Sequence, residues 1–87
     1  MNKVDPKEFG LHARTVLEQV DEDTIALVMA RKSRIIMADG RTILEKVEQI
    51  QEVRPKVNVI LKTSAPVCSK TIGFLDKAGI TIHSLQP

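Results

Sequence analysis

The sequence predicts an α/β fold, or alternatively an α+β fold, arranged as a two-layer sandwich. Short apolar runs alternate with longer segments whose apolar residues recur every three or four positions, which is the pattern of buried strands and amphipathic helices. The expected order of elements is α-β-β-α-β-α-β. The strand–helix–strand–helix–strand run over residues 34–85 favours right-handed crossovers and parallel pairing of those strands.

The expected sheet is mixed and four-stranded, with the helices mainly on one face. Strands that are covered on both faces are nearly continuous apolar runs. Residues 24–30 fit that description, whereas residues 57–63 and 80–85 include polar positions and indicate a face open to solvent. The polar positions on that face are Asn58, Lys62, Thr81 and His83. A three-layer arrangement, in which the first helix crosses to the other face, is the alternative.

The first expected element is a helix over residues 6–20. Asp5 can cap it, Pro6 suits the first helical position, and Glu8 can complete a capping box. The carboxylates of residues 21–23 end it, because negative charge is unfavourable at the carboxyl end of a helix dipole. Its apolar stripe consists of Phe9, Ala13, Val16, Leu17 and Val20.

Two strands and a second helix follow. Residues 24–30 and 34–38 are apolar runs separated by three polar residues, which suggests a hairpin with a basic turn, or else one bent strand. Asp39 can cap the next helix, and Pro55 ends it because the residue before a proline is disfavoured in helical conformation. The buried stripe of this helix is expected to be Ile43, Leu44, Val47, Ile50 and Val53.

The last third of the chain predicts a strand, a helix and a strand. Residues 57–63 alternate in the manner of a half-buried strand. Pro66 suits the first turn of the third helix, and Gly79 ends that helix because glycine tolerates the left-handed conformation. Residues 80–85 form the final strand. The inner side of the third helix is expected to hold Val67, Thr71, Phe74 and Ala78, flanked by Cys68, Ile72 and Leu75.

Composition limits the class of protein. Eighty-seven residues, of which 43% are hydrophobic and 28% charged, suit a single globular α/β domain over residues 1–87. No apolar run approaches the roughly 20 residues of a membrane span, and the amino-terminus has no signal-peptide core. The single Cys68 excludes an intramolecular disulfide framework, so we expect a reducing, cytoplasmic setting. His12, Cys68 and His83 are not paired at ligand spacing, so no metal or cofactor is expected.

Charge is unevenly distributed along the chain. Residues 1–23 carry three bases and six acids, which gives −3, whereas residues 24–87 carry ten bases and five acids, which gives +5. The acidic segment could lie against the basic one, or the basic part could attract an anionic partner.

A candidate anion-binding site joins the strand at 57–63 to the start of the third helix. Hydroxyl groups, free backbone N–H groups and a lysine converge there, and a helix amino-terminus favours negative charge. The same position would lower the pKa of Cys68 if its sulfur faced the helix terminus, and the thiolate is the reactive form of cysteine. The candidate residues are Thr63, Ser64, Cys68, Ser69, Lys70 and Thr71.

Residues 57–82 resemble the first strand, helix and second strand of a glutaredoxin. In that family a cysteine stands at the helix start within a Cys-x-x-Cys or Cys-x-x-Ser pattern, so the resemblance implies a reactive thiol at Cys68. Thr71 occupies the position of the second thiol or serine. The sequence ends at Pro87, without the later cis-proline loop of a glutaredoxin.

The run Gly10-Leu11-His12-Ala13-Arg14 resembles the phosphoryl-accepting loop of the histidine-containing phosphocarrier proteins. The resemblance implies that His12 accepts a phosphoryl group and that Arg14 helps to hold it. Thr15 replaces the proline of that family. The helix expected over residues 6–20 would also place His12 in mid-helix, away from the free N–H groups that a phosphoryl group needs.

Nucleic-acid binding is a further hypothesis. Arg31, Lys32 and Arg34 place three cations at the expected hairpin tip, and Lys62 can join them on the open sheet face. The chain has no Trp and no Tyr. Its two Phe residues lie on expected buried stripes, Phe9 on that of the first helix and Phe74 on that of the third. Stacking on single strands is therefore disfavoured, and contact with duplex or backbone remains.

The leading functional hypothesis is a small intracellular, non-enzymatic binding module whose partner is another protein or a second copy of itself. A domain of this size has a small core, and pairing of sheets or edges would bury more apolar area. No residue pattern supports catalysis, so enzyme status is uncertain and leans to no. A small anionic ligand at 63–71 and nucleic acid at 31–34 are the alternatives; no cofactor and no membrane contact are expected.

Overall fold

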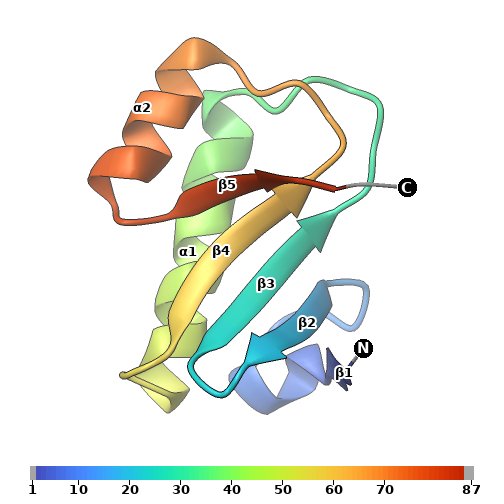
Figure 1. Ribbon diagram of the computed structural model, residues 1–87, viewed down its shortest axis with the longest axis vertical. Coiled ribbons are helices and arrows are strands. Elements are labelled where there is room, and N and C mark those ends of the chain that lie inside the picture. Colours follow the sequence, from blue (N-terminus) through green and yellow to red (C-terminus); the bar gives the residue numbers. More distant parts are fainter. Residues whose placement is uncertain (1, 86–87) are drawn as a thin grey trace.

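A mixed five-stranded sheet organises the part of the chain that the structure describes, residues 2–85 of a computed structural model (Figure 1). The strands lie in the order β1-β2-β3-β4-β5. β1–β2 and β2–β3 are antiparallel, and β3–β4 and β4–β5 are parallel. The strands are β1 (Asn2–Val4), β2 (Val16–Asp21), β3 (Thr24–Met29), β4 (Asn58–Thr63) and β5 (Thr81–Ser84).

The helices of residues 2–85 are a short 3-10 helix, η1 (Pro6–Phe9), and the α-helices α1 (Met37–Val53) and α2 (Ser69–Lys77). α1 connects β3 to β4 and lies behind the sheet in Figure 1, and α2 connects β4 to β5 and lies at the upper left, beyond the β5 edge. The predicted two-layer sandwich is therefore confirmed, although its sheet has five strands where four were expected.

The helix predicted over residues 6–20 is wrong beyond its first turn. η1 ends at Gly10, whose φ of 72° is left-handed and stops the helix, and the chain then enters β2. In β2 the buried Leu17 pairs with Leu27 of β3, so long-range pairing outweighs the helical spacing of the apolar residues. Of the acidic residues 21–23, Asp21 ends β2 and the other two form the turn between β2 and β3, so they do not end a helix.

The second strand predicted over residues 34–38 is also wrong. Only Ile35 makes a β-bridge there, and α1 begins at Met37. The Asp39 carboxylate accepts the N–H of Ile36 at 2.9 Å, which caps α1 from within its first turn. The basic segment is thus a strand-to-helix loop at the carboxyl end of β3, and not the tip of a hairpin.

The hydrophobic core lies between the sheet and the two α-helices. Its strand side includes Ile25, Leu27, Val59 and Leu61, all at most 3% exposed. The buried stripe predicted for α1 is confirmed at Ile43, Val47 and Ile50, whereas Leu44 is half-buried and Val53 is exposed. α2 contributes Leu75 and Thr71, both fully buried.

α1 and α2 approach closely at Gly40. A Cβ atom at Gly40 would lie 2.9 Å from Cγ2 of Thr71, so only glycine leaves room for the first turn of α2. This contact places the amino-terminus of α2 next to the start of α1. In residues 2–85, neither α-helix has the length and apolar character needed to cross a membrane.

Candidate nucleic-acid interface

Two loops run side by side at the carboxyl ends of β3 and β4. Ile35 and Val67 form a parallel bridge, in which the N–H of Ile35 donates to Pro66 O at 2.9 Å and the N–H of Cys68 donates to Ile35 O at 2.9 Å. The bridge unites two candidate sites that the sequence presented as separate. We call the surface formed by residues 31–36 and 64–70 the basic edge.

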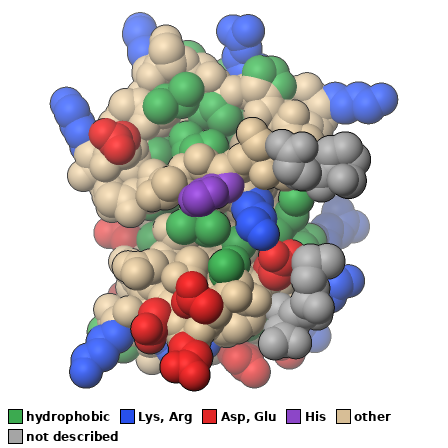
Figure 2. Space-filling model, in the orientation of Figure 1, with side chains coloured by type: hydrophobic (Ala, Val, Ile, Leu, Met, Phe, Trp, Pro, Cys, Tyr) green, Lys and Arg blue, Asp and Glu red, His purple; other side chains and the backbone are tan. Residues whose placement is uncertain are grey.

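The basic edge carries four cations and no carboxylate: Arg31, Lys32, Arg34 and Lys70. Lys32, Arg34 and Lys70 are exposed, and no ion pair joins any of them to a described carboxylate. Figure 2 shows Lys and Arg side chains projecting from the upper end of the molecule, where β3 and β4 end, and most of the acidic side chains gathered towards the lower end. On the face shown there, acidic side chains are therefore concentrated towards one end.

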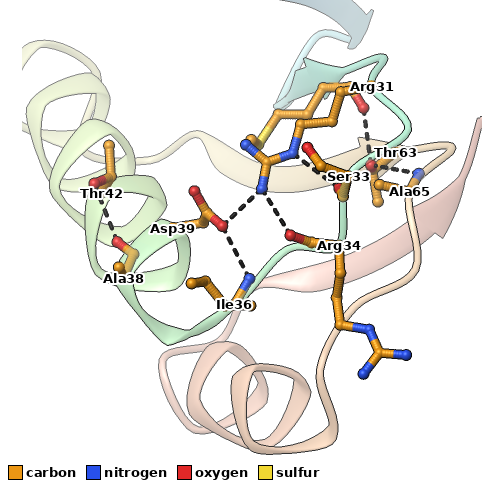
Figure 3. A network of polar contacts seen from close by, with 10 residues as sticks. Arg31, Ser33, Arg34, Ile36, Ala38, Asp39, Thr42, Thr63 and Ala65 are labelled. Atoms are coloured by element: carbon orange, nitrogen blue, oxygen red, sulfur yellow. Dashed lines mark hydrogen bonds and ion pairs between the residues drawn. The ribbon is translucent and has the colours of Figure 1, made fainter.

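The Arg31 side chain forms its polar contacts within its own loop and with the first turn of α1. Its guanidinium donates to Ser33 O at 3.2 Å and to Arg34 O at 3.1 Å, and it pairs with the Asp39 carboxylate at 2.6 Å (Figure 3). The Arg31 side chain is 32% exposed and that of Asp39 is 27% exposed. Arg31 therefore differs from Lys32 and Arg34, although the sequence placed all three together as phosphate contacts.

Hydrogen bonding lowers the pKa of Asp39 below its ordinary value of 3.8. The bond from Arg31 has the largest effect and the N–H of Ile36 the next, and together they outweigh partial desolvation. Asp39 is thus a charged anchor that connects the basic edge to the first turn of α1.

Replacing Asp39 by Asn is expected to lower the free energy of unfolding by about 1 kcal/mol at pH 7, since the pair is partly exposed. The folded pKa lies below the unfolded value, so the stabilisation is complete above the unfolded pKa of 3.8 and disappears as the pH falls through the folded pKa. Urea unfolding of both proteins at a series of pH values measures this difference. A difference that stays constant into strongly acidic solution would contradict the assignment.

Lys62 lies on the uncovered face of the sheet and is already paired. Its ammonium lies 2.8 Å from the carboxylate of Glu18 on β2, so the pair passes over β3. On β3 the fully buried Ala26 stands opposite Glu18 and Val28 stands opposite Lys62, so the ion pair crosses β3 diagonally. Lys62 is therefore less available to an anion than the exposed cations of the basic edge.

Two of the predicted anion-binding residues hold the loops together. The Thr63 hydroxyl donates to Met29 O at 2.8 Å and accepts the N–H of Ala65 at 3.0 Å. The Ser64 hydroxyl donates to Arg31 O at 3.4 Å. The structure thus gives these hydroxyl groups partners within the protein.

The remaining predicted residues surround the start of α2. Ser69 and Lys70 are exposed in its first turn, whereas Thr71 is buried against Gly40. The backbone N–H groups of Lys70 and Thr71 lower the pKa of the half-buried Cys68 thiol, and the charge of Arg34 contributes less. The direction of this pKa shift is the one expected for Cys68 at a helix start, and anion binding at residues 63–71 stays a prediction.

His12 does not occupy the predicted mid-helix position. It is exposed in the turn before β2, where its Nδ1 accepts the N–H of Arg14 at 3.0 Å. No helix begins there, whereas the resemblance to the phosphocarrier proteins implies one. Across residues 2–85, no three His, Cys, Asp or Glu side chains gather in a way that could hold a metal ion.

Sequence reasoning missed Asp39 and Glu18 as partners of the predicted cations. Asp39 follows Arg31 by eight positions, and the strand expected over residues 34–38 placed the two residues at opposite ends of that strand. Glu18 was assigned to a helix, so its place opposite β3 could not be anticipated. Knowing that β2 pairs with β3 would have been needed to predict the contact between Glu18 and Lys62.

No protein-family model and no curated protein matches the chain. Solved structures that share its fold include EndoMS in its apo form, with a TM-score of 0.66 and 25% identity over 83% of this chain and 34% of that chain. The EndoMS–dsDNA2 complex has the same TM-score and identity, and 30% of its chain is covered. A repair endonuclease from Pyrococcus abyssi has a TM-score of 0.65 and 20% identity, with 83% of this chain and 32% of that chain covered.

This chain therefore spans about a third of the length of each of these proteins. The similarities overturn the leading hypothesis from the sequence: the prediction of a non-enzymatic protein-interaction module is wrong, because the fold is shared with EndoMS, which was also solved as an EndoMS–dsDNA2 complex, and with a repair endonuclease. Among the hypotheses drawn from the residues, the nucleic-acid alternative agrees best with these similarities. The chain thus shares the fold of one part of EndoMS and of one part of a repair endonuclease.

Proposed function

We propose that this chain binds the phosphate backbone of duplex DNA through its basic edge. The observation that carries the proposal is the Ile35–Val67 bridge, which joins the loop that holds Lys32 and Arg34 to the segment that leads into Lys70 of α2, in one surface whose own residues include no carboxylate. The likeness to the EndoMS–dsDNA2 complex supports the choice of DNA as the partner. The proposal concerns binding and is independent of sequence recognition.

Phosphate contact suits the three exposed cations. Lys32 and Arg34 are exposed in the loop after β3, and Lys70 is exposed in the first turn of α2, which the Ile35–Val67 bridge joins to that loop. The amino-terminus of α2 adds partial positive charge between them. Such contacts release counterions from DNA, and that release supplies most of the sequence-independent affinity.

Duplex is the preferred form because the chain offers little for unstacked bases. It has no Trp and no Tyr. Phe9 is 4% exposed, and Phe74 is half-buried close to Gly40 of α1. Proteins that hold single strands normally present exposed aromatic rings on which bases stack. Contact with the regular backbone of a duplex needs no such ring.

Fluorescence anisotropy with a labelled duplex, repeated over a series of salt concentrations, tests the proposal. About three phosphate contacts predict a slope of log K against log salt of roughly −3. A single strand of the same length should bind more weakly. The Lys56→Gln variant is the control, because Lys56 is exposed at the opposite end of β4. Absence of binding at low salt, or affinity that does not change with salt, would reject the proposal.

A further inference from the structure

We infer that Arg31 and Asp39 form a latch that positions the basic edge for DNA, with Arg31 acting through the loop rather than on phosphate. This inference rests on the proposed function and assigns the residues of that site two different tasks. Lys32, Arg34 and Lys70 contact the backbone. Arg31 and Asp39 fix the direction in which the loop presents its cations.

The latch spans the whole loop. One guanidinium contacts the carbonyl groups of Ser33 and Arg34 and the carboxylate of Asp39, at 3.2, 3.1 and 2.6 Å. The same carboxylate oxygen accepts the N–H of Ile36 at 2.9 Å. The loop is therefore held against the first turn of α1, a rigid element whose start is packed on α2 through Gly40.

The latch separates the two arginines of the loop. Figure 3 shows the Arg34 side chain extending away from the network in which Arg31 and Asp39 take part. Because the carbonyl groups of Ser33 and Arg34 are both bound, the backbone on either side of Arg34 keeps one direction. An ordered loop loses less conformational entropy when it binds a ligand, which is the advantage of a preorganised site.

The guanidinium shape explains why this position holds arginine. A planar fork with several N–H donors can reach two carbonyl groups and a carboxylate at once, whereas a lysine ammonium is a compact charge on a flexible stem. The charge of Arg31 is also balanced by Asp39 at 2.6 Å, so it adds less to the attraction for phosphate than an unpaired cation does.

Asp39→Asn distinguishes the latch from simple electrostatics, because the two accounts predict opposite signs. Removing a negative charge beside a cationic surface should strengthen DNA binding if charge alone matters. If the latch positions the loop, the loss of the ion pair should weaken binding. The asparagine oxygen can still accept the N–H of Ile36, so the cap of α1 is retained.

The experiment measures duplex affinity for Asp39→Asn, Arg31→Lys and the double variant, with Glu45→Gln as the control. Glu45 is exposed in the middle of α1, so its variant removes a negative charge without touching the latch. Each latch variant is expected to bind roughly tenfold more weakly, since ordering of the loop then accompanies binding. The double variant should be no weaker than the weaker single variant, and the salt slope should stay unchanged. Glu45→Gln should bind as well as the unmodified chain or slightly better.

Backbone 15N relaxation gives a second readout that needs no DNA. Order parameters of residues 32–34 should fall in both latch variants and stay unchanged in Glu45→Gln. If the unmodified chain binds duplex and Asp39→Asn binds equally or more tightly, the latch is rejected and the proposed function stands. If the unmodified chain fails to bind, the proposed function is rejected. The ordering of the loop by Arg31 and Asp39 is then tested by relaxation alone. Unchanged order parameters of residues 32–34 in the latch variants would reject the latch as well.

Discussion

Neutralising Lys32, Arg34 and Lys70 together, each by substitution with Gln, is expected to reduce duplex affinity by two to three orders of magnitude near 0.1 M salt. One phosphate contact contributes roughly tenfold at that salt concentration, and its loss lowers the magnitude of the salt slope by about one. The triple variant should therefore bind with almost no dependence on salt. All three side chains are exposed, so the fold should remain unchanged. Anisotropy titrations and a circular dichroism spectrum measure both properties.

A second triple variant controls for net charge. Lys7→Gln, Lys56→Gln and Lys77→Gln remove the same number of charges from exposed positions in η1, in the turn before β4 and at the end of α2. Each triple lowers the formal net charge from +2 by three, to −1. The control triple should retain most of the affinity and most of the salt slope. Equal losses in the two triples would show that net charge, and not the basic edge, determines binding.

Ile35→Ala is expected to lower the free energy of unfolding by about 2–4 kcal/mol, because truncating a buried isoleucine leaves a cavity. Ile35 is fully buried and its backbone forms the bridge to Val67. Its side chain anchors the point at which the two loops of the basic edge meet. The loss of packing should therefore also weaken duplex binding in the variant that remains folded at low temperature. Urea unfolding measures the first effect, and anisotropy measures the second.

The neighbouring Ile36 supplies a matched control for Ile35. It is the same residue type, one position along, and is 51% exposed. Ile36→Ala should change the free energy of unfolding by no more than about 0.5 kcal/mol, as exposed substitutions usually do. Similar destabilisation by the two substitutions would mean that Ile35 does not anchor the loops as described.

The second half of the fold could be predicted because its local signals agree with its tertiary structure. The helix expected after Asp39 became α1, and the strand at 57–63, the helix after Pro66 and the strand at 80–85 became β4, α2 and β5. Apolar spacing, a cap and a breaking proline or glycine all indicated the same elements there. Long strand–helix–strand units also allow few alternatives in topology.

The first half could not be predicted because its local signals disagree with its tertiary structure. The apolar residues from Phe9 to Val20 recur at helical spacing, yet Gly10 ends the first turn and Leu17 pairs with Leu27. The interaction that outweighs this helical spacing is the pairing of β2 with β1 and β3. It joins residues too far apart in the sequence to be detected from a short stretch of it. The same error hid the Lys62–Glu18 pair.

The sequence predicted the separate segments of the candidate site, but not that they lie next to each other. The cations at 31–34 and the helix start near Cys68 were both singled out by residue type. These two segments are joined by the bridge between Ile35 and Val67, which lie 32 positions apart in the chain. The role of Arg31 depends on Asp39, whose carboxylate was expected only to cap a helix. The similarity to EndoMS and to a repair endonuclease was less accessible still, since neither composition nor spacing indicated that shared fold.

The most direct test is a chemical-shift map of the 15N-labelled chain titrated with a short duplex. The amide signals of residues 31–36 and 64–70 should shift most, whereas those of the β2–β3 turn and of the turn that contains Lys56 should stay in place. Added salt should reverse the shifts. A map centred on the uncovered face of the sheet, on the acidic end of the molecule, or spread evenly over the chain would contradict the assignment of DNA binding to the basic edge.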